Sequence, residues 1–325
     1  MAERQIAFRE AIAEAIKEEM TRDEKTFAMG EDMAVIGGAF GATKGLLEEF
    51  GEERVMDTPI SETAIVGFAL GAAIAGMRPI VEIMRCDWMT ICMDEIVNQT
   101  AKMRYFTGGR PQIAVVIRTA TEGGIGLGAQ HSQSFEAWFT HVPGLKVVMP
   151  SPPYDAKGLL KAAIRDHNPV IFMEPQILYG ASGPVPAEDY VVPLGKADVK
   201  REGKDITIVA WGGITPRVMN AAQTLADEGI DAEVIDPRTL RPLDIETIVA
   251  SVKKTSKAVI AHEANKTSGF GAEVAAQIQE LAFDYLDAPI QRVGAPDVLV
   301  PINRNLERIV LPGPERVIEA VKAIL

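Results

Sequence analysis

Two polar side chains stand in surroundings that suit acid-base chemistry. Glu62 ends the segment 57–62 and directly precedes a run of small apolar residues, 64–77. A carboxyl group buried beside such a run is desolvated, which raises its pKa until it can share a proton with a nitrogen base. His131 lies in the glycine-rich segment 123–133, whose backbone can adopt the turns that present a side chain. An acid and an imidazole together predict proton transfer to and from a bound molecule.

The elements that must position these side chains alternate between strands and helices. Apolar residues recur at helical spacing between Arg4 and Met20, and similar patterns predict helices near 62–77, 88–105 and 154–165. Short apolar runs predict strands at 26–32, 79–84, 113–119, 146–151 and 169–174. This alternation predicts an α/β fold whose parallel strands are covered on both faces.

The chain is long enough for two domains. Its 325 residues exceed the usual size of one domain, and between Tyr179 and Asp205 the periodic pattern gives way to Gly, Pro and charged residues. The alternation then restarts, with strands expected at 205–212, 231–237, 257–263 and 290–296. We therefore expect a first domain at 1–185, a linker at 186–204 and a smaller α/β domain at 205–325.

Composition excludes several classes of protein. With 33 Lys and Arg against 45 Asp and Glu, the formal net charge of −12 opposes binding to nucleic acid or to an anionic membrane surface. No apolar run is long enough to span a bilayer, and the charged N-terminal segment lacks the apolar core of a secretory signal. Cys86 and Cys92 suggest neither a disulfide framework nor a zinc site, so we expect two reduced core thiols in a cytoplasmic protein.

An ordered series of short motifs runs along nearly the whole chain. The motifs are DTPISE, GMRPIVE, AQHSQS, PGLKVVMPS, YDAKGLL and AIRDHNPVIF, followed by IDPRTLRPLD, EANKTSGFGAE and LDAPIQRVGAPD. This order resembles the β subunit of the thiamine-diphosphate-dependent first component of 2-oxo acid dehydrogenase complexes. The resemblance implies a parallel-sheet pyrimidine-binding domain followed by a transketolase C-terminal-type domain. It also implies an α2β2 heterotetramer that passes an acyl group to a lipoyl-bearing acyltransferase core.

The resemblance implies that the cofactor is shared with another chain. Enzymes of this kind hold the diphosphate and its Mg²⁺ with a Gly-Asp-Gly motif followed by paired Asn, and no Gly-Asp-Gly occurs here. Residues 30–32, Gly-Glu-Asp, lack the following Asn pair and are no substitute. In the family that motif belongs to the α subunit, so thiamine diphosphate and Mg²⁺ are expected at an α/β interface.

The same resemblance assigns roles to matched positions. Glu62 matches the Glu that hydrogen bonds the aminopyrimidine ring nitrogen, and His131 matches a His that faces the substrate and the acyl acceptor. Trp88 matches the aromatic residue that stacks on the pyrimidine, and Met84 a hydrophobic residue beside it. The structural alternatives are dipole stabilisation in a first helical turn for Glu62, surface exposure for His131, and core packing for Trp88 and Met84.

Two further segments match possible ion-binding sites. Ala163, Asp166 and Asn168 match positions where some relatives supply carbonyl oxygens to a structural K⁺, although Asp and Asn after a helix are equally expected in a plain turn. His262 and Glu263, together with the segment 269–271, end a strand and open a helix, a geometry that can hold an anion.

The substrate and two rival functions stay open. Residues 98–109 and 140–160 look more like acetoin-cleaving relatives, and Arg85 and Asp87 depart from the pyruvate-type pattern, while the broader family favours pyruvate or another 2-oxo acid. One rival is half of a split transketolase-like enzyme, which needs basic groups for sugar phosphates, and few Arg or Lys occur near Glu62 or His131. The other rival is a non-catalytic interaction subunit.

Overall fold

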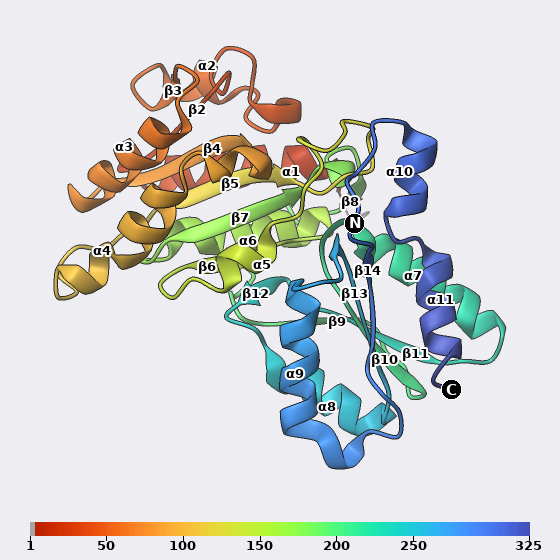
Figure 1. Cartoon of the computed structure of the whole chain (residues 1–325). Helices are drawn as coiled ribbons and strands as arrows, with labels where there is room; N and C mark the ends of the chain where they lie inside the picture. The colour runs from red at the N-terminus through yellow and green to blue at the C-terminus, as the bar shows by residue number, and fades with distance from the viewer. Residues whose placement is uncertain (1–3) are drawn as a thin grey trace. The chain divides into compact units, whose positions relative to one another are not determined.

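The computed structural model describes residues 4–325, which form two compact units. The first contains the residues up to Thr121 together with Trp138–Leu194, and the second contains Glu122–Ala137 together with Gly195–Leu325. Each unit is a mainly parallel sheet with helices on it (Figure 1), so the predicted fold class is confirmed. The glycine-rich segment belongs to the second unit, whereas the sequence placed it in the first domain. The predicted boundaries at 185 and 205 stay a prediction.

The first unit is built on strands that run parallel in the order β6-β7-β5-β4-β2-β3. Their bounds are β2 Thr26–Gly30, β3 Val55–Asp57, β4 Arg78–Arg85, β5 Val116–Thr121, β6 Lys146–Val148 and β7 Val170–Pro175. Every residue of β2, β5 and β7 is buried, as expected for parallel strands that are covered on both faces.

Helices cover both faces of this sheet. Helices α1 (Phe8–Arg22) and α6 (Pro153–Arg165) pack in one core with inward residues of the strands, among them Ile80, Val116 and Phe172. Helix α3 (Glu62–Ile74) packs against β4, and Figure 1 shows it with α4 (Ala101–Phe106) on the side away from α1 and α6. Short elements complete the unit: α2 (Leu46–Phe50), α5 (Glu136–Thr140), and the 3-10 turns η1 (Ala39–Gly41) and η4 (Gln176–Leu178).

The helix predicted at 88–105 is wrong as a single element. The chain instead forms a 3-10 turn η2 (Cys86–Thr90), a π-helix η3 (Glu95–Thr100) and α4. The Lys102 ammonium donates to the Val97 carbonyl oxygen at 3.0 Å, which satisfies a backbone acceptor within the wide π turns. Wide turns of this kind are rare and concentrate at functional sites, and periodicity alone does not reveal them.

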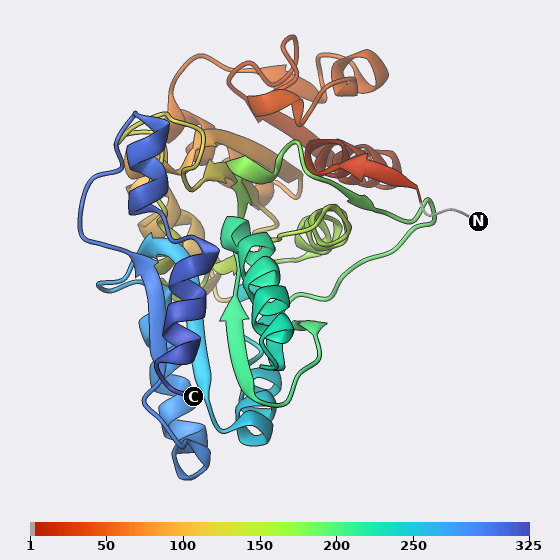
Figure 2. The same ribbon diagram turned by 90° about the vertical axis from the view of Figure 1, so that its right-hand side faces the viewer.

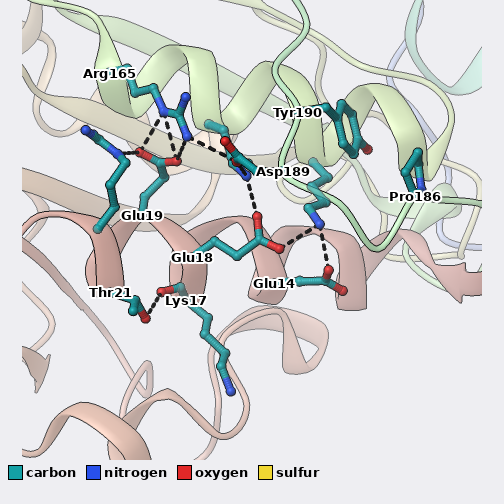
Figure 3. Close-up of polar contacts among 12 residues, drawn as sticks. Glu14, Lys17, Glu18, Glu19, Thr21, Arg165, Pro186, Asp189 and Tyr190 are labelled. Atoms are coloured by element: carbon teal, nitrogen blue, oxygen red, sulfur yellow. Dashed lines mark hydrogen bonds and ion pairs between the residues drawn. The ribbon is translucent and has the colours of Figure 1, made fainter.

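The first part of the predicted linker is an ordered strap on the first unit. Strand β8 (Ser182–Pro184) pairs antiparallel with β1 (Gln5–Ala7), and beyond it Tyr190 stacks on Tyr154 with ring centroids 4.6 Å apart. Figure 3 shows the ion pairs between α1, α6 and this strap, in which Lys161 contacts both Glu18 and Asp189. Composition predicted a linker because Gly, Pro and charged residues dominate it, but Asp189 of this strap pairs with the buried Lys161 and with Arg165.

The second unit carries a sheet in the order β14-β13-β10-β11-β9, in which only β9 is antiparallel to its neighbour. The strands are β9 Asp198–Arg201, β10 Ile206–Ala210, β11 Ala232–Asp236, β13 Ala258–Asn265 and β14 Gln291–Ala295, and a short strand β12 spans Thr239–Arg241. Helices α7 (Thr215–Asp227) and α11 (Pro314–Lys322) share one apolar core with the sheet, and α8 (Ile245–Thr255) and α9 (Phe270–Ala282) pack together (Figure 2). Helix α10 (Arg304–Val310) and the turns η5 (Gly212–Ile214) and η6 (Phe283–Tyr285) complete it.

Within residues 4–325, every helix is too short or too polar to cross a bilayer.

Candidate active site

Glu62 is the first residue of α3 and its side chain is buried, with 6% of the residue exposed. The helix begins five residues after β3 ends, so Glu62 lies at the carboxyl edge of the parallel sheet, where ligands of open α/β sheets bind. The small residues that follow let α3 pack closely on β4. The sequence therefore predicted the burial of Glu62 correctly.

Glu31 is a second buried carboxyl group of this site that sequence reasoning missed. It follows the last residue of β2, which is the neighbour of β3 in the sheet, and it is 8% exposed. Burial raises the pKa of Glu31, and the nearby Glu62 carboxylate raises it further. Like charges repel, so the Glu62 carboxylate makes ionisation of Glu31 less favourable than burial alone does.

Cys92 also faces Glu62. Burial, followed by the Glu95 and Glu62 carboxylates, raises the pKa of the Cys92 thiol to about 12. Both Cys86 and Cys92 are buried free thiols, as predicted. The thiol of Cys92 therefore stays protonated and unreactive at neutral pH.

Met84 and Trp88 lie at the end of β4 and in the turn η2 that follows it, in the same unit as Glu62. Both residues are half-buried, unlike their neighbours Ile83 and Met89, whose side chains are in the core. An indole with an accessible face offers a stacking surface for a flat ring. The burial pattern thus leaves the predicted stacking role available.

His131 lies in a closed loop of the second unit. The loop is joined at its base by the Glu122 N–H, which donates to the Gln133 carbonyl oxygen at 3.1 Å. The His131 N–H donates to the Gly128 carbonyl oxygen at 3.2 Å, which forms a turn just before the half-buried imidazole. His131 therefore belongs to the second unit, whereas Glu62 belongs to the first.

Buried carboxyl groups surround the base of this loop. Glu122 accepts a hydrogen bond from the Gly213 N–H at 2.8 Å, and Glu136 lies 3.5 Å from the indole nitrogen of Trp211. Burial raises the pKa of Glu122 well above its usual value, with the Glu263 carboxylate adding to the effect. Burial also raises the pKa of Glu136, to about 7, and that of Glu263. Burial therefore makes each of these three carboxyl groups a weaker acid than an exposed one.

We expect the free energy of unfolding to depend on pH through Glu136. The carboxyl has an ordinary pKa of 4.5 in the unfolded chain and about 7 in the folded one. Between these values the folded state binds the extra proton, so stability falls as pH rises, by about 2 kcal/mol between pH 5.5 and 8. Glu136→Gln should remove this decrease, as measured by urea unfolding of the chain at both pH values.

The relevant quantity is the difference between the two proteins, because other groups titrate in the same range. His262 acts in the opposite direction, since burial lowers its pKa to about 4. Glu280→Gln, at an exposed position on α9, is the control and should leave the pH dependence unchanged. Equal pH dependence in the wild type and Glu136→Gln would contradict the assignment.

The space beside the possible anion site at 269–271 is filled by the packed side chain of His262. A Cβ atom on Gly269 would lie 2.6 Å from His262 Cε1, and one on Gly271 would lie 2.6 Å from His262 Cδ2. The imidazole is fully buried and stacks on Trp211 with centroids 5.2 Å apart. These glycines make room for a neutral ring rather than for a charged ligand.

The three residues matched to a potassium site form the turn after α6. The Asp166 N–H donates to the Ala163 carbonyl oxygen, and Asp166 Oδ1 accepts from both the backbone and side-chain nitrogens of Asn168. Although burial opposes it, the ion pair with Lys146 helps hold the pKa of Asp166 below its usual range. Arg104 donates to Asn168 Oδ1 at 2.7 Å. The Ala163 and Asp166 carbonyl oxygens also accept hydrogen bonds, from the Asp166 N–H and from Arg78 at 3.2 Å, so a potassium ion bound by these carbonyls would share them with those donors.

Within the described part of the chain, no group of three or more His, Cys, Asp and Glu side chains is arranged to hold a metal ion.

Comparison with known families defines the class to which this fold and site belong. Residues 4–181 match the pyrimidine-binding domain of transketolase, and residues 195–317 match the transketolase C-terminal domain. Among solved structures, a chain described as a split gene transketolase, inactive beta4 tetramer, superposes with a TM-score of 0.82 at 26% identity, covering 98% of both chains. Fold and family models together define a two-domain, transketolase-like protein.

Curated relatives narrow the class. The chain is 48% identical to pyruvate dehydrogenase E1 component subunit beta of Rhizobium meliloti, over 97% of this chain and 69% of that one. It is 48% identical to the same subunit of Rickettsia felis, over 98% of each. It is 45% identical to acetoin:2,6-dichlorophenolindophenol oxidoreductase subunit beta of Bacillus subtilis, over 99% and 98%. The chain belongs to the family of beta subunits of thiamine-diphosphate-dependent pyruvate and acetoin dehydrogenases.

Proposed function

We propose that this chain is the β half of a shared active site that takes an acyl group from pyruvate or acetoin and passes it to a lipoyl-bearing acyltransferase core. The observation that supports it most is the buried Glu62 carboxyl group, which lies beside Glu31 at the carboxyl edge of the first sheet. A buried acid at that edge suits proton exchange with a nitrogen base of a bound cofactor.

Thiamine diphosphate, when bound, supplies a carbon nucleophile that attacks the carbonyl group of the substrate. In the proposal Glu62 hydrogen bonds the ring nitrogen of the aminopyrimidine and holds the proton that this ring exchanges. Glu31 adds a second carboxyl group at this edge, and burial together with the Glu62 carboxylate raises the pKa of Glu31. The buried position of Glu62 also excludes water that would compete for the hydrogen bond.

The other matched residues orient the reacting groups. Trp88 supplies the stacking surface for the aminopyrimidine, and Met84 contributes apolar contact beside it. His131 faces the substrate side, where its imidazole donates a proton to, or accepts one from, the oxygen atom of the reacting carbonyl. These roles assign binding to the first unit and proton transfer at the substrate to the second.

The proposal requires an α subunit that carries the Gly-Asp-Gly motif, holds Mg²⁺ and the diphosphate, and forms the α2β2 heterotetramer. It also places the protein in the cytoplasm, which cell fractionation with an antibody to this chain would check.

A split transketolase half is the second candidate, because one structural relative is a split gene transketolase. That relative is 26% identical, whereas the pyruvate and acetoin dehydrogenase subunits reach 45 to 48%. Sugar phosphates need basic groups, and the groups that raise the pKa of Glu31 after burial are the carboxylates of Glu62, Asp32 and Glu82. The acidic surroundings favour the dehydrogenase function.

The substrate is decided by a kinetic comparison. Pyruvate and acetoin donate the same two-carbon acyl group, but only pyruvate carries a carboxylate that needs a cationic partner. We expect the reconstituted α2β2 enzyme, assayed with an artificial electron acceptor, to turn over one of these two substrates with a kcat/KM at least about tenfold above that of branched 2-oxo acids. Activity confined to sugar phosphates would overturn the dehydrogenase assignment.

We further propose that the turn formed by Ala163, Asp166 and Asn168 binds K⁺ through its backbone carbonyls. If it does, the melting temperature of the chain should be higher in KCl than in choline chloride at equal ionic strength, because a ligand that binds only the folded state stabilises it. Asn168→Ala removes a side chain that contacts Arg104 and Asp166 but leaves the backbone carbonyls in place, so it should retain the difference. Equal melting temperatures in both salts would mean that this turn does not bind K⁺.

A further inference from the structure

Carboxylates from two distant segments hold the backbone of the loop that carries His131. The Gly123 N–H donates to Glu263 Oε1 at 2.6 Å. The Gly124 and Gly126 N–H groups donate to the two oxygens of Glu307, at 2.8 and 2.9 Å. One loop therefore directs three backbone donors at two carboxylates, an arrangement that resembles a backbone nest around an anion.

These contacts lie within the second unit. Glu263 is in β13 and Glu307 is in α10, and Figures 1 and 2 both show α10 beside the loop drawn in yellow. The residues are 2% and 1% exposed, respectively. Hydrogen bonds from N–H groups to buried carboxylates are stronger than those between neutral groups.

The loop has little freedom to move away from these carboxylates. Gly124 and Gly126 have φ angles of 98° and 79°, which other residues rarely adopt. A Cβ on Gly126 would lie 2.9 Å from Arg304 Cγ, so the loop backbone touches α10 directly. The base of the loop is closed between Glu122 and Gln133. The short turn from Gly128 to His131 connects the held glycines to the residue that carries the imidazole.

We propose that Glu307 and Glu263 are positioning residues for His131, which hold its loop in place through these backbone hydrogen bonds. The inference rests on the proposed role of His131 in acyl transfer. It gives α10 a part in that function, because the two oxygens of Glu307 hold the loop and the loop carries the imidazole. Neither glutamate touches substrate or cofactor in this proposal.

The test compares Glu307→Gln with Arg308→Gln in the reconstituted α2β2 holoenzyme. The amide keeps the size of the side chain but replaces one acceptor oxygen with a donor that opposes a loop N–H. Hydrogen–deuterium exchange of the peptide covering 122–133 should become at least about tenfold faster in Glu307→Gln, because the protecting bonds are weakened. The neighbouring Arg308 is exposed, whereas Glu307 is buried against the loop, so the Arg308 variant should exchange like the wild type. Unchanged protection of this peptide in Glu307→Gln would overturn the proposal.

A double-mutant cycle separates positioning from a general structural role. Glu307→Gln should lower kcat for transfer to the lipoyl domain by at least about tenfold while the affinity for thiamine diphosphate stays within about twofold. In a His131→Ala background the same change should have almost no further effect, because the residue that it positions is gone. If each substitution instead lowers kcat by its own factor and the two factors multiply in the double variant, the positioning role is wrong.

Two additional outcomes keep the inference separate from the proposed function. If His131→Ala leaves acyl transfer unchanged, the catalytic role of His131 fails, whereas the exchange experiment still decides whether the carboxylates hold the loop. If Glu307→Gln does not fold, Glu307→Asp shortens the side chain while keeping its charge. It should accelerate exchange of the 122–133 peptide in the same way, and normal protection in that variant would contradict the proposal.

Discussion

Replacing Glu62 with Gln is expected to slow proton exchange at the reactive carbon of the bound cofactor by at least about a hundredfold. The amide has the same shape and can still form a hydrogen bond, but it has no acidic proton to share with the aminopyrimidine nitrogen. General acid-base groups typically contribute 10²- to 10⁴-fold, and a hundredfold corresponds to about 2.7 kcal/mol of barrier. The measurement is deuterium exchange at that carbon in the reconstituted α2β2 enzyme, quenched at intervals.

Binding and assembly should survive this substitution, because the side chain keeps its volume at the start of α3. Glu52→Gln, the same chemical change at an exposed position of the first unit, is the control and should exchange at the wild-type rate. An unchanged exchange rate in Glu62→Gln would reduce Glu62 to a residue that stabilises the first turn of its helix.

The sequence predicted Glu62 because the relevant information is local. A polar segment, a carboxyl group and a run of small apolar residues follow one another within about twenty positions, and helix packing buries Glu62 together with Ile65 and Val66. Glu31 was missed although it lies after an equally clear strand. Its importance comes from the pairing of β2 with β3, which places the ends of two strands side by side. The order of strands in a parallel sheet depends on long connections, so it cannot be predicted from the sequence of either strand alone.

His131 shows the same division between local and distant information. Glycines at 124, 126 and 128 predict backbone conformations that other residues rarely adopt, and the structure confirms positive φ angles at all three. The acceptors for that backbone, Glu263 and Glu307, lie 140 and 183 residues away from their partners in the chain. Nothing near either glutamate indicates that it accepts hydrogen bonds from a loop. Such contacts become visible only when the second unit is folded.

The isolated chain is expected not to bind thiamine diphosphate measurably. The diphosphate is strongly negative and needs Mg²⁺ and backbone or cationic donors, while the sequence lacks the Gly-Asp-Gly motif and carries a net charge of −12. The carboxylates of Glu62 and Asp32, which influence Glu31, would repel a diphosphate further.

Calorimetric titration with Mg²⁺ present measures this directly. The chain alone should give no saturable heat up to roughly millimolar cofactor, equivalent to a binding free energy weaker than about −4 kcal/mol. Addition of an α chain that carries Gly-Asp-Gly and the Asn pair should produce saturable binding in the same cell, which serves as the positive control. Since Glu62, Met84 and Trp88 are assigned only to the aminopyrimidine end, they provide apolar contact and one hydrogen bond but no partner for the diphosphate. Micromolar binding by the chain alone would therefore mean that the diphosphate site lies within this subunit, and the shared active site would have to be abandoned.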